Sequence, residues 1–226
     1  MGSLTHRPVT RRAALVAAAV GLTAALGGFG AATALASDHD GSAGSWAAAP
    51  KATVSTSSTS AYTCFVTYPG GSTNVSYSLS YTSEGPGTVA PYHPYVVQVD
   101  FPVITPNPTI NEQVADVTFN IALPPGAVFL DYNLTGGSGV TPTVQVANGV
   151  VSVEADGPFP AATPFQFPSI SLLLFSGAAG TETVNQFGTT LSAPAFSWVR
   201  TDLTGTARPF ACFLPAAVPL TATTVG

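Results

Sequence analysis

The sequence is poor in charged residues. Only 8% of its 226 residues are Asp, Glu, Lys or Arg, against about a quarter in an average soluble domain. Its six Lys and Arg residues are outnumbered by eleven Asp and Glu residues. The chain therefore lacks the dense positive surface that binds a nucleic-acid backbone, and we expect no nucleic-acid partner.

The sequence also lacks the familiar catalytic motifs. It has two cysteines and three histidines, and it contains no GxSxG elbow, HExxH pair, phosphate loop or GxGxxG fingerprint. We therefore expect a non-enzymatic protein without a cofactor or a metal ion. Glycine and proline are abundant instead, with 22 and 20 residues, and 46% of the chain is hydrophobic. This composition favours short strands and turns around a core over long helices.

The first 36 residues have the layout of an export signal. A basic segment ends at Arg11-Arg12 and is followed by an uncharged, Ala- and Gly-rich run. The paired arginines favour twin-arginine export over the Sec route, and the small residues of Ala34-Leu35-Ala36 suit cleavage before Ser37. The alternative is a retained membrane anchor, because the uncharged run is long enough to span a bilayer. Four glycines argue against an anchor, since glycine lowers hydrophobicity and helix propensity.

We expect the cleaved protein to be secreted or loosely associated with the cell wall. Three bases would remain against eleven acids, which keeps the chain off anionic membranes. Its partner would be an unidentified protein or a cell-wall component.

Composition then divides the cleaved chain into three parts. Residues 37–60 are rich in Ala, Ser, Thr and Gly without periodicity, which predicts a flexible linker. Asp38-His39-Asp40 falls in this linker, where nothing would hold three metal ligands in place. Residues 61–216 form the predicted domain, and residues 217–226 a flexible tail.

The predicted domain alternates apolar and polar residues with a period of two, which indicates half-buried β-strands. Proline- and glycine-rich turns separate these runs. The clearest runs are Tyr62 to Tyr68, Val75 to Tyr81, Tyr95 to Phe101, Ala115 to Leu123, Phe196 to Trp198 and Pro209 to Leu214.

One hairpin is predicted to the residue. Asn148-Gly149 tolerates the positive φ of a two-residue type I′ turn, which places Val146 opposite Val151 and Val144 opposite Val153. The phase slips between Phe165 and Phe175, and Pro168 at the slip predicts a bulge or a strand break. The apolar run around Leu173 suggests a strand covered on both faces, with a short buried helix as the alternative.

The two cysteines predict one disulfide, between Cys64 and Cys212. An exported chain meets an oxidising environment, where unpaired thiols are unusual. The bridge would join the first and last strands of the domain. A redox or metal-binding pair is the alternative, but neither cysteine has a basic neighbour or a CxxC partner.

Two further groups of residues are candidate sites. Tyr81, Tyr92, His93 and Tyr95 flank one loop and are weak candidates for ligand binding, since exposed aromatic rings stack on sugars and peptides. Paired carboxylates would support a hydrolase or a calcium site. The acids concerned, which all fall on the polar phase of their strands, are Asp100, Asp116, Asp131 and Glu154.

The TRRAAL signal, the YTCF opening strand and the FACF closing strand resemble secreted actinobacterial β-sandwich proteins of unknown function. That resemblance implies a fold and a location but no activity. We expect an antiparallel, Ig-like β-sandwich of about eight to ten strands. It would serve as a non-enzymatic interaction or structural module of the cell envelope or extracellular space. The alternatives are a binding protein for a small apolar or sugar ligand and a carboxylate-dependent hydrolase.

Overall fold

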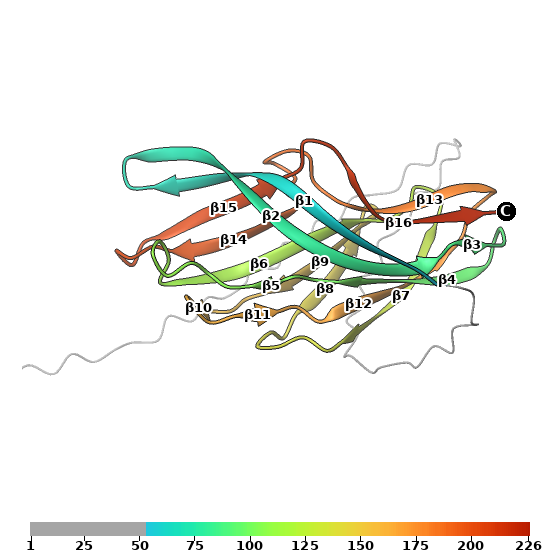
Figure 1. The fold of residues 1–226 in the computed structure, drawn as a ribbon, viewed down its shortest axis with the longest axis horizontal. Coiled ribbons are helices and arrows are strands. Elements are labelled where there is room, and N and C mark those ends of the chain that lie inside the picture. The colour runs from blue at the N-terminus through green and yellow to red at the C-terminus, as the bar shows by residue number, and fades with distance from the viewer. Residues whose placement is uncertain (1–52) are drawn as a thin grey trace, which may run out of the picture. The chain divides into compact units, whose positions relative to one another are not determined.

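The two-residue periodicity of the sequence appears in the structure as β-strands. The computed structural model describes residues 53–226, and every regular element in that range is a strand (Figure 1). The strands are β1 (Thr53–Tyr68), β2 (Gly71–Pro86), β3 (Thr88–Val89), β4 (Pro94–Asp100), β5 (Val103–Ile104), β6 (Gln113–Ala122), β7 (Val128–Thr135), β8 (Thr143–Ala147), β9 (Val150–Ala155), β10 (Phe159–Pro160), β11 (Phe165–Gln166), β12 (Ser169–Phe175), β13 (Gly180–Gln186), β14 (Phe196–Thr201), β15 (Ala207–Phe213) and β16 (Val218–Val225).

Fourteen strands join in one continuous sheet, in which all pairs but one are antiparallel. The main order is β3-β16-β13-β6-β14-β15-β1-β2-β4-β12-β7, with β8, β9 and β10 attached through β6. The exception is the parallel contact of β16 with β3. The all-β prediction is confirmed, in a sheet arrangement consistent with a β-sandwich. The described part of the chain has sixteen strands, more than the eight to ten expected, and four of them have only two residues. An Ig-like strand order stays a prediction.

Distant parts of this sheet pack their inner faces against each other. Phe119 of β6 lies within 6.5 Å, ring centre to ring centre, of Tyr81, Phe101, Phe167 and Phe196. These rings come from segments far apart in the sequence, and all five residues are buried. Burial of such large rings supplies much of the apolar stabilisation of a domain.

The predicted hairpin is confirmed in its register. Val146 pairs with Val151 and Val144 with Val153. Asn148 and Gly149 of the turn have φ values of 52° and 74°, as a type I′ turn requires.

The predicted break at Pro168 is also present, since β11 ends at Gln166 and β12 begins at Ser169. β12 is a strand and not a helix, with β4 on one side and β7 on the other. Its exposure alternates, however, so that Leu172 and Leu174 are buried while Leu173 is only half-buried. The apolar run is therefore not equally covered on both faces.

The two ends of the described chain differ from the prediction. Residues 53–60, expected to be flexible, belong to β1 and pair with β2. Residues 218–225, expected to be a flexible tail, form β16 between β13 and β3. Both segments are rich in hydroxyl side chains, and one of these has a partner inside the protein: Thr223, 1% exposed, donates to the Pro86 carbonyl at 2.9 Å. The expected signal peptide, the Asp38-His39-Asp40 cluster and the rest of the expected linker lie outside the described residues.

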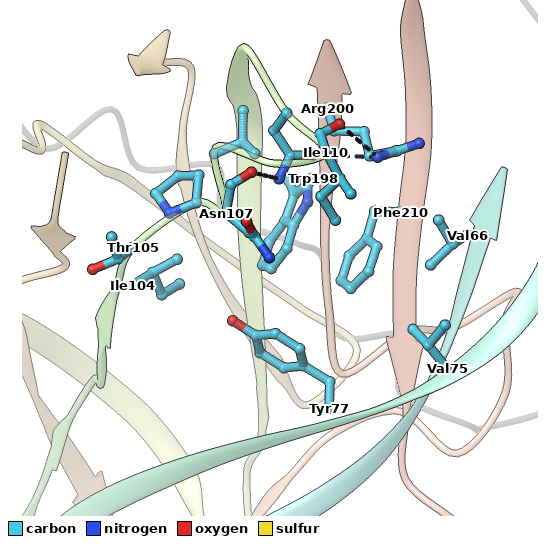
Figure 2. Close-up of a pocket in the computed structure, with 13 residues that line it drawn as sticks. Val66, Val75, Tyr77, Ile104, Thr105, Asn107, Ile110, Trp198, Arg200 and Phe210 are labelled. Atoms are coloured by element: carbon cyan, nitrogen blue, oxygen red, sulfur yellow. Dashed lines mark hydrogen bonds between the residues drawn. The ribbon is translucent and has the colours of Figure 1, made fainter. Parts of the chain in front are cut away.

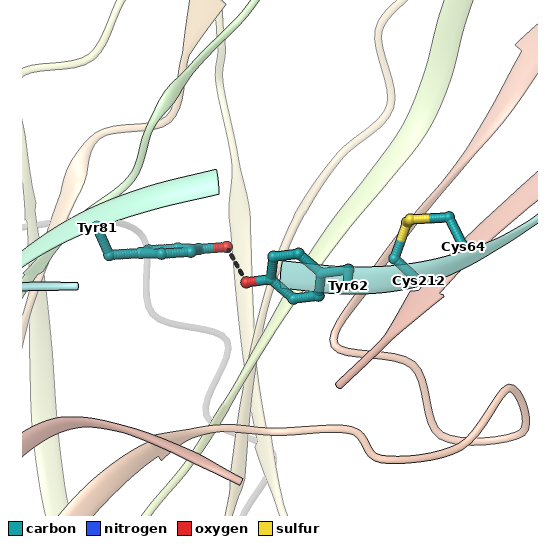
Figure 3. Close-up of a disulfide and its surroundings, with 4 residues drawn as sticks. All are labelled: Tyr62, Cys64, Tyr81 and Cys212. Atoms are coloured by element: carbon teal, nitrogen blue, oxygen red, sulfur yellow. Dashed lines mark hydrogen bonds between the residues drawn. A yellow bond between two sulfur atoms is a disulfide. The ribbon is translucent and has the colours of Figure 1, made fainter. Parts of the chain in front are cut away.

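The disulfide between Cys64 and Cys212 is present, with both residues fully buried (Figure 3). Cys64 of β1 lies directly opposite Cys212 of β15 in their antiparallel ladder. The bridge does not join the first and last strands, because β16 follows β15. It locks two neighbouring strands in register.

Candidate ligand-binding pocket

An apolar pocket of about 280 Å³ opens where the β1–β2 hairpin extends past the core. Figure 1 shows this hairpin beside β15, to which β1 is paired through residues 63–66. The opposite wall is the segment 104–111, which runs from β5 toward β6. Known small-molecule sites are mostly apolar hollows of about 300–1,000 Å³ with a few polar groups. The volume therefore suits a small ligand.

Three aromatic side chains from three strands form the inner wall of this pocket (Figure 2). Trp198 of β14 and Phe210 of β15 stack with their ring centres 4.3 Å apart and their planes 7° apart. Tyr77 of β2 meets both rings edge-on at 6.0 Å. Trp198 pairs with Phe210 and Phe210 with Val66. Val66 in turn pairs with Thr73, four residues before Tyr77 on β2, so all three rings project from the same face of the β14-β15-β1-β2 sheet.

Tyr77 brings a polar group to this apolar wall. Its hydroxyl has no hydrogen-bond partner among residues 53–226, and burial raises the pKa of the phenol. Figure 2 shows the ring reaching from β2 across the pocket toward Ile104 and Asn107. A ligand that accepts a hydrogen bond would satisfy a hydroxyl that is partly removed from water.

The opposite wall is a turn fixed by Asn107. Its side-chain oxygen accepts hydrogen bonds from the backbone N–H and the hydroxyl of Thr109, at 2.9 and 2.8 Å. Its carbonyl accepts from the backbone N–H groups of Ile110 and Asn111. Asparagine between two prolines forms such turns readily. Ile110 is consequently held over the pocket with 51% of its surface exposed.

Arg200 of β14 is the single charged residue in the pocket lining. It is 5% exposed and follows Phe196 and Trp198 on the inward phase of the strand. One terminal nitrogen donates to the Ile110 carbonyl at 3.1 Å and to the Asn111 side-chain oxygen at 3.4 Å. The other donates to the Thr67 carbonyl at 3.0 Å. The guanidinium therefore links β1 to the Asn107 turn.

The structure does not bring the four predicted ligand-binding residues together as an open aromatic surface. Tyr81 and Tyr95 are 4% and 6% exposed. The Tyr95 hydroxyl donates to the Glu182 carboxylate, and burial followed by this hydrogen bond raises the pKa of Tyr95 far above its usual value. Both tyrosines belong to the core, where their rings are closed to a ligand.

Tyr92 and His93 remain at the surface. Tyr92 is 64% exposed and adopts a positive φ of 57° in the turn before β4. The His93 backbone N–H donates to the Ser176 hydroxyl at 3.0 Å, and one ring nitrogen lies 2.7 Å from the Pro91 carbonyl oxygen. These contacts fix the turn. They leave Tyr92 as the one exposed tyrosine of the predicted set.

The candidate carboxylates are dispersed over several strands. Asp100 and Glu154 accept hydrogen bonds from the neighbouring amide side chains of Gln98 and Gln145. Asp131 accepts from the next backbone N–H. Asp116 occupies a bulge of β6 with φ 52°, which explains why the inward phase shifts from Val114 to Val117. Among residues 53–226 no three His, Cys, Asp or Glu side chains gather as a metal site.

The sequence contains a signal for the inward-facing arginine of the pocket lining. Phe196, Trp198 and Arg200 alternate on one strand face, so the same periodicity that places the two rings inward also places the arginine inward. Bases on the buried face of a strand are rare. Trp198 packs in the core, at 8% exposure. It lies at the margin of the core because of where the β1–β2 hairpin and the Asn107 turn lie. The residues next to Trp198 in the sequence do not indicate the position of either one.

Comparisons with known proteins show the fold alone. No family model matches the chain, and no curated protein matches it. One similar solved structure is a protein from Corynebacterium diphtheriae, an actinobacterium, described as membrane anchored. It shares 15% identity with a TM-score of 0.52 over 76% of this chain. This chain spans 38% of that protein.

A second solved structure is a cohesin module from a Clostridium perfringens family 33 glycoside hydrolase. It has 8% identity and a TM-score of 0.38, over 65% of this chain and 95% of that one. Within the described range, this chain has no helix with the length and apolar character needed to cross a membrane.

Proposed function

We propose that the protein is a non-enzymatic binding module that works outside the cell and holds a small, mainly apolar ligand in the pocket beneath the β1–β2 hairpin. The observation that carries this proposal is the pocket itself, a hollow of about 280 Å³ walled by Tyr77, Trp198 and Phe210. Exposure of apolar surface to water is unfavourable, and a bound ligand removes it. Apolar hollows of this kind therefore commonly mark binding sites.

Two observations support a place outside the cell. The buried disulfide is typical of proteins that fold in an oxidising compartment. The similar solved structure from Corynebacterium diphtheriae is described as membrane anchored, which favours a role at the cell envelope. The export signal expected in the first 36 residues would deliver the chain there.

A titration with N-phenyl-1-naphthylamine tests the binding proposal. This neutral dye fluoresces strongly only in apolar surroundings, and we expect saturable binding of one dye per chain. Val75 lines the mouth of the pocket and is 37% exposed. The larger ring of Val75→Phe should occupy the mouth and weaken binding by about tenfold or more, equivalent to roughly 1.4 kcal/mol.

The matched control is Val128→Phe, the same exchange at a 57% exposed position on β7. It should leave dye binding unchanged. If the dye fails to bind, or if both variants reduce its affinity equally, the pocket is not the binding site.

A second candidate function, an interaction module for another protein, is favoured by an edge of β2 with which no other described strand pairs. Residues 71–81 pair with β1 on one side, while β4 pairs with β2 only at residues 82–84. An extended segment of a partner could therefore add a strand to this edge. Ser78 is exposed on β2, and Ser78→Pro should prevent binding of the partner while the dye still binds. If the partner still binds to Ser78→Pro, this edge is not the interaction site.

A further inference from the structure

The charge of Arg200 has no counter-ion in the described part of the chain. Within residues 53–226 the one ion pair joins Arg208 to Asp202. The partners of Arg200 are the Ile110 and Thr67 carbonyls and the Asn111 amide oxygen, all of them neutral. These oxygens satisfy hydrogen bonds but leave the positive charge uncompensated.

This arginine is also incompletely hydrogen bonded. Its side chain is 5% exposed, and its Nε atom is buried without any partner. Burial of a charge in apolar surroundings is costly unless the charge is paired. Arg200 shares the pocket lining with Trp198 and Phe210, and no carboxylate lines the pocket. The structure therefore holds a cation at the margin of an apolar hollow.

The surroundings make this cation unusual. Arg200 and Arg208 are the two bases among residues 53–226, where nine acids are found. Arg208 is paired with Asp202, so Arg200 is the remaining positive charge of the region. Its three hydrogen bonds hold the Asn107 turn against β1, but a neutral apolar ligand would leave its buried charge uncompensated.

We propose that the ligand of the pocket carries an anionic head group on an apolar body, with Arg200 as the residue that recognises the head group. The inference rests on the binding function proposed above. A carboxylate or sulfonate beside the guanidinium would form a charge-assisted hydrogen bond, which is stronger than one between neutral groups. The apolar body would lie against the rings of Trp198, Phe210 and Tyr77.

Competition between two matched ligands tests this proposal on the unaltered protein. 4-Phenylbutyrate and 4-phenylbutanol have the same body and differ in the charge of the head group at neutral pH. Each is used to displace bound N-phenyl-1-naphthylamine. A purely apolar pocket prefers the alcohol, because the carboxylate must lose its water. We expect the carboxylate to displace the dye at a concentration about tenfold lower than the alcohol.

Variants assign that preference to one residue. Arg200→Met keeps an unbranched side chain but removes the charge, and it should reverse the order, so that the alcohol competes better. Arg200→Lys keeps the charge and should retain the preference for the carboxylate. Arg208→Met changes the net charge equally at a residue outside the pocket lining, and this variant, although it loses the ion pair with Asp202, should still prefer the carboxylate.

The outcomes separate the two proposals. If the dye does not bind, the binding function itself is wrong. If the dye binds but the alcohol competes better in the wild type, the anionic head group is wrong and the binding function stands. This comparison holds even if Arg200→Met fails to fold. If folded Arg200→Met prefers the carboxylate as strongly as the wild type does, Arg200 does not recognise the head group.

Discussion

Tyr62 lies inside the core two residues before Cys64, and its hydroxyl points away from the disulfide toward Tyr81 (Figure 3). It donates to the side-chain oxygen of Gln186 and lies 3.2 Å from the Tyr81 hydroxyl. Gln186 in turn donates to the Ser60 hydroxyl at 2.6 Å. This buried network joins β1, β2 and β13. Ser60, at 2% exposure, reads as a linker residue in the sequence, but its hydroxyl accepts this hydrogen bond inside the protein.

Tyr62 also predicts how stability depends on pH. Burial raises its pKa to about 12, against a hydrogen bond from Tyr81 that lowers it. A raised pKa means that the folded state holds its proton longer than the unfolded state. The protonated Tyr62 therefore contributes on the order of 2–3 kcal/mol to the free energy of unfolding. This contribution is complete below about pH 10 and is lost as the pH rises through about 12.

Denaturant unfolding of the wild type and Tyr62→Phe at pH 7 and pH 11 measures this effect. The variant should be less stable at pH 7 by about 1–3 kcal/mol, because Gln186 loses its donor. It should then lose less stability than the wild type on going to pH 11. An equal loss in both proteins would show that Tyr62 does not titrate as described.

Secondary structure was predicted well where a strand has one apolar face and poorly where it has none. The β8–β9 hairpin was placed to the residue, because the alternating valines and the Asn148-Gly149 turn gave the same register. β16 was missed, since Thr221 and Thr223 read as polar although both are buried. The pocket could not be predicted, because it depends on the distance between the β1–β2 hairpin and the Asn107 turn, which far-apart segments determine together.

The same hairpin gives a prediction about backbone strain. A Cβ at Gly149 would meet no atom within 4 Å, but the residue has a φ of 74°. Gly149→Ala therefore tests conformation alone and should destabilise the protein by about 1–2 kcal/mol. Gly126→Ala is the control, because its Cβ also has open space and its φ is not positive. Thermal unfolding compares them, and equal melting temperatures would contradict the type I′ turn.

At the scale of the whole molecule, the disulfide closes a long loop. Cys64 and Cys212 are 148 residues apart in sequence, and most of the described strands lie between them. Such a link restricts the unfolded chain, and its removal from a domain commonly costs about 2–5 kcal/mol. We expect Cys64→Ala/Cys212→Ala to fold with a free energy of unfolding reduced by that amount. An unchanged midpoint in guanidinium unfolding would show that β1–β15 pairing needs no covalent support.

The disulfide also borders the pocket. Two residues along each strand from the bridge, Val66 pairs with Phe210, and both side chains line the hollow. The covalent bond therefore holds one wall of the pocket in its final shape before any ligand binds. Because this wall is already ordered, less conformational entropy is lost when a ligand binds to it. A reducing agent should consequently lower the affinity of the pocket for N-phenyl-1-naphthylamine, even under conditions where the sheet stays folded.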